Sequence, residues 1–165
     1  MTGEFSSKND DVFMENQHSE RQIKDLVDAR VKAIKNRNID DASVDYAANL
    51  VLFDIVGPLE YTGPNLVRNR LGEWFETFDE NAPGQFEVVA FEVKANGNLA
   101  FSHSLNHINA TLKDGNKLDM WWRETQNWSK IDGAWKVLHS HSSVPFDPQT
   151  GKPLLNLKPD ASTPA

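Results

Sequence analysis

A carboxylate, an arginine and a histidine in this sequence have the side-chain chemistry to move a proton and to stabilise the charge that results. Asp54 lies in the apolar run NLVLFDIVG, and on a strand with a side-chain period of two it points to the same face as the neighbouring leucines. A carboxylate on an apolar face can take a proton from a carbon or oxygen acid. Arg123 or His141 can then stabilise the developing oxyanion. The sequence therefore predicts Asp54, Arg123 and His141 as catalytic residues.

Structural roles for the same charged side chains stay open as alternatives. Asp54 can cap the turn at Gly57-Pro58, or it can hold Arg30 or Arg123 in a buried ion pair. Arg30 falls on the apolar stripe of a predicted helix, where a solvated arginine is not expected. Its side chain can also extend along the edge of that stripe to reach water. A buried ion pair would by itself explain why these charges are present.

The clearest local pattern is a hairpin between residues 121 and 145. Two alternating runs are joined there by Asp132-Gly133, a dipeptide typical of tight hairpin turns. The loop is either the three residues 131–133, closed by a glycine bulge, or Asp132-Gly133 alone. We predict the three-residue loop, because Asp tolerates the bridge region of the backbone and Gly supplies a positive φ.

The length of this loop decides which side chains meet across the hairpin. The three-residue loop places Arg123 opposite His141 and Thr125 opposite His139. The two-residue loop would place Glu124 opposite His141 and would turn Arg123 to the other face of the sheet. With the predicted register, Arg123, His139 and His141 lie on the concave side of the sheet, toward the helices.

The histidines and tryptophans predict the wall of a pocket. His103 and His107 share one strand face, as do His139 and His141. Two imidazoles on one face can bind a metal ion, but zinc needs further ligands at about 2.0 to 2.1 Å, and no single motif supplies them. We therefore predict no metal site and no cofactor, and we expect the histidines to hydrogen-bond within the pocket wall. The predicted ligand-binding residues are Arg30, His103, Trp121, Thr125 and His139.

The remaining patterns predict an α+β domain. Three helices come first: one from the capping box at Ser19, a short one capped by Asp40, and one opened by Gly63-Pro64. NLVLFDIVG is a buried strand before the third helix. From Gln85 onward, strands are separated by Asn-Gly or Asp-Gly pairs, which predicts a four-strand antiparallel meander. The sheet must curl over the helices to bury both sets of aromatic side chains.

Length and composition fit one domain with two loose ends. We predict a flexible arm over residues 1–18, the domain over residues 19–147 and an extended tail over residues 148–165. The net charge of -7 and the lack of a Lys/Arg run argue against binding to nucleic acid or to an anionic membrane surface. No apolar run approaches the roughly 20 residues of a membrane span, and the first residues lack a signal-peptide pattern, so we expect a cytoplasmic protein.

Taken together, these segments resemble the SnoaL-like branch of the nuclear-transport-factor-2-like superfamily. The resemblance covers about residues 19–147 and is carried by the first helix, LVLFDIVGPLEYTG, the helix after Pro64, and R-x-T followed by KIDGAWKVLHSHSSVPF. The superfamily includes ketosteroid isomerases, SnoaL-type polyketide cyclases and scytalone dehydratase. It implies a cone-shaped half-barrel, in which a curled mixed, mainly antiparallel sheet packs on three N-terminal helices around a pocket. It also implies homodimers, often through the outer face of the sheet.

The family's functional residues carry over only in part. Asp54 in FDIVG matches the general-base aspartate of ketosteroid isomerase. The isomerase's oxyanion-hole tyrosine aligns near Arg30 and its second acid near Thr125, so neither oxyanion donor is kept. Arg123, Thr125 and His141 instead match the R-x-T and DG-x-W-x5-H pattern of SnoaL-like proteins. The resemblance thus implies the fold and leaves the reaction open.

Two functions follow as expectations. One is a small-molecule pocket protein, an isomerase, cyclase or dehydratase that acts by proton transfer on a small apolar organic substrate. The alternative is a non-catalytic ligand-binding or dimerisation and association module of the same fold. Aromatic residues on both faces of the sheet, such as Trp121 beside Trp122, predict a homodimer, because one face needs a second cover.

Overall fold

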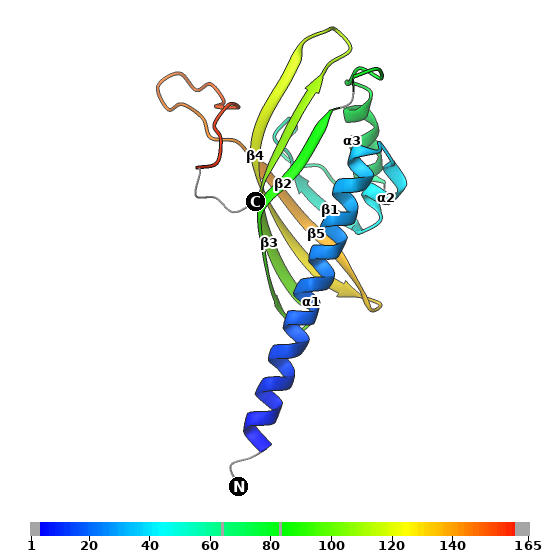
Figure 1. Cartoon of the computed structure of the whole chain (residues 1–165), viewed down its shortest axis with the longest axis vertical. Coiled ribbons are helices and arrows are strands. Elements are labelled where there is room, and N and C mark those ends of the chain that lie inside the picture. The colour runs from blue at the N-terminus through cyan, green and yellow to red at the C-terminus, as the bar shows by residue number, and fades with distance from the viewer. Residues whose placement is uncertain (1–3, 64, 83, 161–165) are drawn as a thin grey trace.

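A five-stranded sheet with helices against one of its faces makes up the fold (Figure 1). The computed structural model describes residues 4–63, 65–82 and 84–160, with side chains from residue 9 onward. Along the chain the elements are α1 (Glu4–Lys35), α2 (Ile39–Ser43), β1 (Tyr46–Phe53), α3 (Leu66–Phe75), β2 (Gln85–Asn96), β3 (Leu99–Thr111), β4 (Lys117–Ile131) and β5 (Ala134–Ser143).

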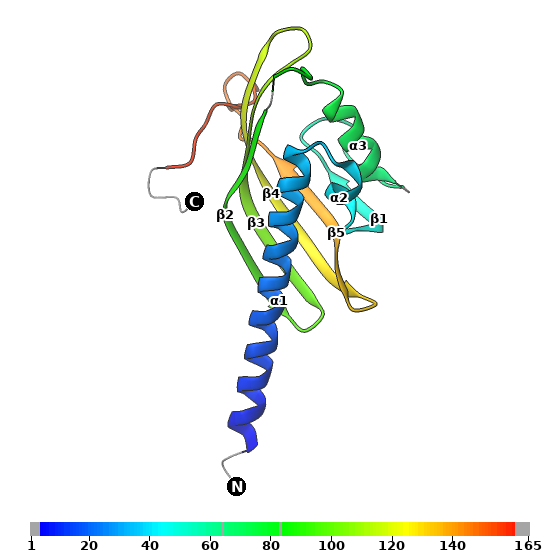
Figure 2. The ribbon, with the colours of Figure 1, turned by 45° about the vertical axis from the view of Figure 1, so that its right-hand side comes forward.

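The strand order β1-β5-β4-β3-β2 makes the sheet mixed. Strands β2 to β5 form an antiparallel meander, which confirms that part of the prediction. β1 pairs with β5 in parallel, an arrangement that needs a long connection, and here α3 and the rest of the meander provide it. The helices and the mixed sheet confirm the predicted α+β class. The sheet is not strongly curled (Figure 2), so the expected cone shape is not seen.

Two apolar clusters hold the helices against the sheet. In the first, Ile23 and Val27 of α1 pack with Trp128 of β4, and the exposed fractions of Ile23 and Trp128 are only 0% and 1%. In the second, Phe75 of α3 packs with Phe86 of β2. The apolar stripes predicted for the first and third helices are therefore the faces that they bury.

Helix α1 begins much earlier than the sequence predicts. Ser19, expected to be its N-cap, lies inside the helix and is buried. No glycine or proline occurs in residues 4–18 to stop a helix, and Asn16 accepts a hydrogen bond from the backbone N–H of Gly97 at the β2–β3 turn (3.0 Å). The predicted arm is thus wrong for residues 4–18, whose first turns project past the end of the sheet (Figure 2). Residues 1–3 lie outside the described part.

The two shorter helices also differ from the prediction at their starts. Asn38, not Asp40, caps α2, because its side chain accepts the backbone N–H of Asp41 (3.2 Å). α3 starts after Asn65, which has a left-handed backbone conformation (φ 56°), and the predicted first helical residue, Pro64, lies outside the described residues. These shifts of a few residues leave the buried faces unchanged.

The hairpin between β4 and β5 has the two-residue loop, so the predicted three-residue loop is wrong. Asp132 and Gly133 both have positive φ, 50° and 81°, and Ile131 pairs directly with Ala134. Two successive positive φ angles define a type I′ turn, whose twist matches that of the flanking strands. Asp tolerates the left-handed conformation well enough to occupy its first position.

A bulge in β5 then shifts the pairing by one more residue. Trp128 pairs with Val137, and Asn127 pairs with His139, which leaves Leu138 without a partner on β4. Beyond the bulge, His141 lies opposite Thr125, and the predicted pairing of Arg123 with His141 is wrong. Because side chains alternate along a strand, the even-numbered residues of β4 face the helices and the odd-numbered ones face away.

The described part of the C-terminal tail folds back against the body of the protein through backbone hydrogen bonds. The backbone N–H of Trp121 donates to the carbonyl of Leu155 (3.0 Å), and that of Leu154 donates to the carbonyl of Pro145 (2.8 Å). The tail therefore lies beside the start of β4, where β5 no longer covers it. Leu157 in this segment is 48% exposed.

The type I′ turn makes stability sensitive to the residue at position 132. Asp132→Val should lower the free energy of unfolding by about 1 kcal/mol, because a β-branched side chain disfavours positive φ. Asp132→Asn should cost nothing, since Asn favours this conformation. Urea unfolding of the three proteins would measure the difference. Equal stability of the Val variant and the wild type would contradict the turn.

Candidate functional site

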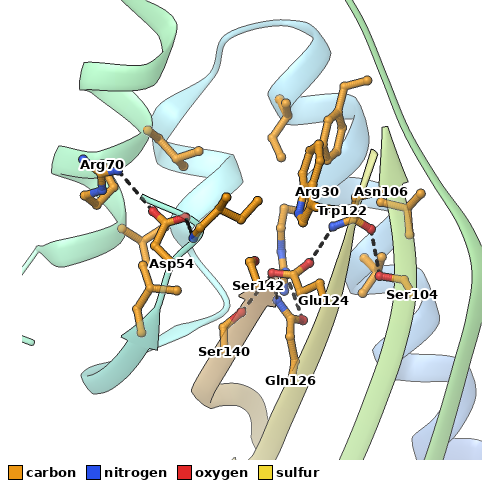
Figure 3. Close-up of a pocket in the computed structure, with 18 of the residues that line it drawn as sticks. Arg30, Asp54, Arg70, Ser104, Asn106, Trp122, Glu124, Gln126, Ser140 and Ser142 are labelled. Carbon is orange, nitrogen blue, oxygen red and sulfur yellow. Dashed lines mark hydrogen bonds and ion pairs between the residues drawn. The ribbon is translucent and has the colours of Figure 1, made fainter. Parts of the chain in front are cut away.

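A cavity of about 280 Å³ lies between the sheet and the helices. Its upper wall is apolar and comes from α1, α3, β2 and β4. The lower wall, on the sheet, is polar, and the rim near the end of β1 carries a charged pair (Figure 3). The apolar wall includes Val31, Ile34, Leu71, Trp74, Phe86 and Trp122.

Glu124 of β4 is the central polar group of the cavity floor. Its Oε1 accepts hydrogen bonds from the side chains of Gln126 (3.1 Å) and Ser140 (2.9 Å), and its Oε2 accepts one from Asn106 (2.9 Å). Asn106 in turn accepts from the hydroxyl of Ser104 (2.8 Å). Three strands, β3, β4 and β5, thus contribute to one hydrogen-bonded cluster, which Figure 3 shows beneath the cavity.

Arg30 of α1 supports this floor from the helix side. Two nitrogens of its guanidinium, Nε (3.2 Å) and Nη2, donate to Oδ2 of Asp45. Its Nη1 donates to the hydroxyl of Tyr46 (2.8 Å) and to Oε1 of Gln126 (3.1 Å). Arginine has only donors, so it fixes the carbonyl end of the Gln126 amide toward itself. The amide nitrogen of Gln126 must then face Glu124.

Burial and charge act in opposite directions on Arg30. Its exposed fraction is 7%, and burial alone would lower the pKa of its guanidinium, but the neighbouring Tyr46 and Asp45 outweigh burial and raise that pKa. Burial raises the pKa of the Tyr46 phenol, partly offset by Arg30. Arg30 therefore stays charged and Tyr46 stays protonated at neutral pH. The contacts around Arg30 are therefore those of a buried ion pair with Asp45.

Asp54 follows the last residue of β1 and lies at the rim of the same cavity. Its Oδ1 accepts the backbone N–H of Ile55 (2.7 Å), and its Oδ2 accepts from Arg70 of α3 (3.1 Å). Both side chains are 24% exposed. Burial would lower the pKa of Arg70, but hydrogen bonds to Asp54 and Glu73 raise it. Asp54 thus lines the cavity. Its ion-pair partner is Arg70, and not Arg30 or Arg123 as expected.

The sequence carries an indication of Arg70, a residue that the predicted site does not include. Arg70 falls three residues after Val67 and four before Trp74, on the apolar stripe of α3. The same pattern singled out Arg30 on α1. The polar floor had a weaker indication, because Ser102, Ser104 and Asn106 alternate along β3, but alternation alone does not say which face of the strand is buried.

Six predicted site residues lie on the opposite face of the sheet. Arg123, Thr125, His103 and His141 are exposed there, and they belong to neighbouring positions of β3, β4 and β5. The sequence predicted that Arg123, His139 and His141 share one face, and they do, but the two-residue loop and the bulge turn that face away from the cavity. The six residues are His103, Trp121, Arg123, Thr125, His139 and His141.

Several of these outer residues have contacts of their own. The ring of Trp121 stacks on that of His107 with centroids 4.3 Å apart, and Nδ1 of His139 lies 2.9 Å from the carbonyl of Val51. His141 borders a second, more open hollow, which Asp54 also borders from the loop side. Within the described residues, no three His, Cys, Asp or Glu side chains are grouped so that they could hold a metal ion.

A family model for the SnoaL-like domain matches residues 23–147. The chain belongs to this family. That match confirms the resemblance seen in the sequence. No curated protein matches the chain. No helix in the described part of this SnoaL-like protein is long and apolar enough to cross a membrane.

Solved structures agree with the family. A nuclear-transport-factor-2-like protein of unknown function from Pseudomonas putida is 29% identical, with a TM-score of 0.77 over 87% of this chain and 98% of that one. A Streptomyces avermitilis protein, provisionally described as a dehydratase of the same family, is 14% identical (TM-score 0.62; 74% and 93% covered). A Xanthomonas campestris protein, provisionally described as a calcium/calmodulin dependent protein kinase II association domain, is 22% identical (TM-score 0.62; 74% and 85% covered). The last two share the fold alone.

The pair of Arg30 with Asp45 should dominate the stability of this region. Arg30→Met removes the charge from a buried site and leaves Asp45 unpaired, so it should lower the free energy of unfolding by about 3 to 5 kcal/mol. Arg68→Met is the matched control, because Arg68 pairs with Asp40 at side-chain exposures of 48% and 76%, and its loss should stay within about 1 kcal/mol. Urea titration of both variants tests this, and equal losses would contradict the role of Arg30.

Proposed function

We propose that this SnoaL-like protein binds a small, largely apolar organic molecule and acts on it by proton transfer, as an isomerase, cyclase or dehydratase. The observation that carries the proposal is the cavity of about 280 Å³, with its apolar wall and its ionisable groups at floor and rim. Cavities of this size, mostly apolar with a few placed polar groups, suit small organic ligands. The provisional description of the Streptomyces avermitilis protein as a dehydratase is in line with this reaction class.

Asp54 is the proposed general base. Its carboxylate borders the cavity, and a base of this kind takes a proton from a carbon next to a carbonyl group or from a hydroxyl group. Arg70, 3.1 Å away, takes the place of Arg123 and His141 as its electrostatic partner. Its positive charge supports a developing oxyanion on the substrate. Proton transfer between such groups needs no cofactor.

The exchange of Asp54 for asparagine separates catalysis from structure. Asp54→Asn should reduce turnover by about 10²- to 10⁴-fold, the usual range for loss of an acid–base group, and should leave binding intact. The melting temperature should change little, because Arg70 keeps its contact with the partly exposed Glu73. Turnover is measured against a panel of enolisable ketones and hydroxylated polyketide-like compounds.

Arg123→Gln serves as the control, because Arg123 is exposed on the opposite face and its loss should not affect turnover. Two results together would sink the catalytic role of Asp54: a wild type inactive across the panel, and a melting temperature that collapses in Asp54→Asn. Those results would favour a structural ion pair of Asp54 with Arg70.

A second proposed function is association, and the exposed apolar side chains of the outer sheet face support it. Leu99, Phe101 and Phe53 are 63%, 51% and 37% exposed there. Exposed apolar side chains on one face are typical of an interaction surface. In a two-fold symmetric dimer, the same face of a second copy would bury them. We propose a homodimer through this face, which is compatible with either a catalytic or a non-catalytic cavity.

Light scattering at micromolar concentration should report a dimer. Phe101→Glu should shift the chain toward the monomer, because it places a charge in the centre of an apolar contact. Val44→Glu is the control, since Val44 is 62% exposed but lies at the end of α2, away from this face. A monomeric wild type would remove the association proposal.

A further inference from the structure

The geometry of the cavity floor points to the chemical class of the ligand: we propose that the cavity selects an organic amine, held in its ammonium form by Glu124. This inference rests on the proposed function, since it presumes that a small molecule enters the cavity. It adds which polar group that molecule carries and where the group binds. The preference for an amine follows neither from the proposed role of Asp54 nor from membership of the family.

Glu124 has room for one more hydrogen-bond donor. An ionised carboxylate offers about four acceptor positions, and three are used, two on Oε1 and one on Oε2. All three partners present a donor: the amide nitrogens of Asn106 and Gln126, and the hydroxyl of Ser140. These contacts leave a free acceptor position on Oε2, within a residue that lines the cavity.

The amide orientations make this arrangement firm. The oxygen of Gln126 is held by Arg30 (3.1 Å), and the oxygen of Asn106 is held by the hydroxyl of Ser104 (2.8 Å). Turning either amide would break its own contact and set an oxygen against the carboxylate. The floor of the cavity therefore presents the acceptor of Glu124 to a ligand, while the amide acceptors nearest to it are already engaged.

Carboxylates outnumber guanidinium groups in and around the cavity. The carboxylates of Asp45, Asp54, Glu73 and Glu124 face two guanidinium groups, those of Arg30 and Arg70. Arg30 is hydrogen-bonded to Asp45 and Arg70 to Asp54, whereas within the described residues no Lys or Arg lies in ion-pair distance of Glu124. A cation on the ligand would pair with Glu124, whereas a carboxylate on the ligand would compete with Asp45, Asp54 and Glu73 for the two guanidinium groups.

The apolar wall suits the rest of such a ligand. The ring of Phe86 lies between those of Trp74 and Trp122, with centroids 6.1 Å and 6.0 Å away, and all three line the cavity. Aromatic faces attract an ammonium group as well as an apolar body. An aryl or alkyl amine therefore meets a complementary surface at both ends.

Four indole compounds of similar shape test the proposal by titration calorimetry at neutral pH: tryptamine, tryptophol, indole-3-acetate and indole. The cationic amine should bind at least about tenfold more tightly than the alcohol, and the acid should bind weakest, because a hydrogen bond between charged groups outweighs a neutral one by about that factor. Glu124→Gln should reduce the affinity for tryptamine at least about tenfold and leave that for indole within about threefold. Glu92→Gln, at an exposed carboxylate beside His103, should change neither.

The outcomes separate this inference from the proposed function. If indole binds and tryptamine binds no better than the alcohol or the acid, the cavity takes small molecules and the amine inference is overturned. The same holds if tryptamine binds best but Glu124→Gln does not weaken it. If none of the four compounds binds, the proposed small-molecule function itself falls. The wild-type comparison decides even if Glu124→Gln fails to fold.

Discussion

The burial of one positive charge, that of Arg30, is the constraint on which the arrangement of this fold depends. A guanidinium group that is 7% exposed must have its donors satisfied and its charge balanced, or it would destabilise the folded state by several kcal/mol. Asp45, Tyr46 and Gln126 meet that need. They come from the segment before β1, from β1 and from β4, so one side chain of α1 joins the helix to two distant strands of the sheet.

The same constraint orders the cavity. Arg30 fixes the amide of Gln126, and that amide, with Asn106 and Ser140, fixes the carboxylate of Glu124. A polar floor thus persists beneath an apolar wall. In low-dielectric surroundings a hydrogen-bonded cluster of this kind is rigid. The cavity is therefore preorganised for a ligand, and its second ion pair, Asp54 with Arg70, stands at the rim where a substrate would react.

The sequence predicted the elements better than the site. Alternation and the Asp-Gly and Asn-Gly pairs located the meander, and apolar stripes located the buried faces of α1 and α3, because these features depend on local geometry. The site depended on register. A two-residue loop at Asp132-Gly133 moved Arg123 to the outer face and brought Glu124 to the cavity, and the unpaired Leu138 moved His139 and His141 to the outer face as well. A bulge in mid-strand has no dependable local pattern, so this part was not predictable. Asp54, at a strand end and independent of that register, was placed correctly at the cavity.

A crystal structure at about 1.2 Å resolution, where amide orientation and carboxylate bond lengths can be read directly, tests the central claim that Arg30 holds a charged Glu124 in the cavity floor. The account predicts equal C–O bonds in Glu124, the oxygen of Gln126 toward Arg30 and its nitrogen toward Glu124. Unequal C–O bonds, which mark a protonated carboxyl group, or a Gln126 amide turned the other way would contradict it.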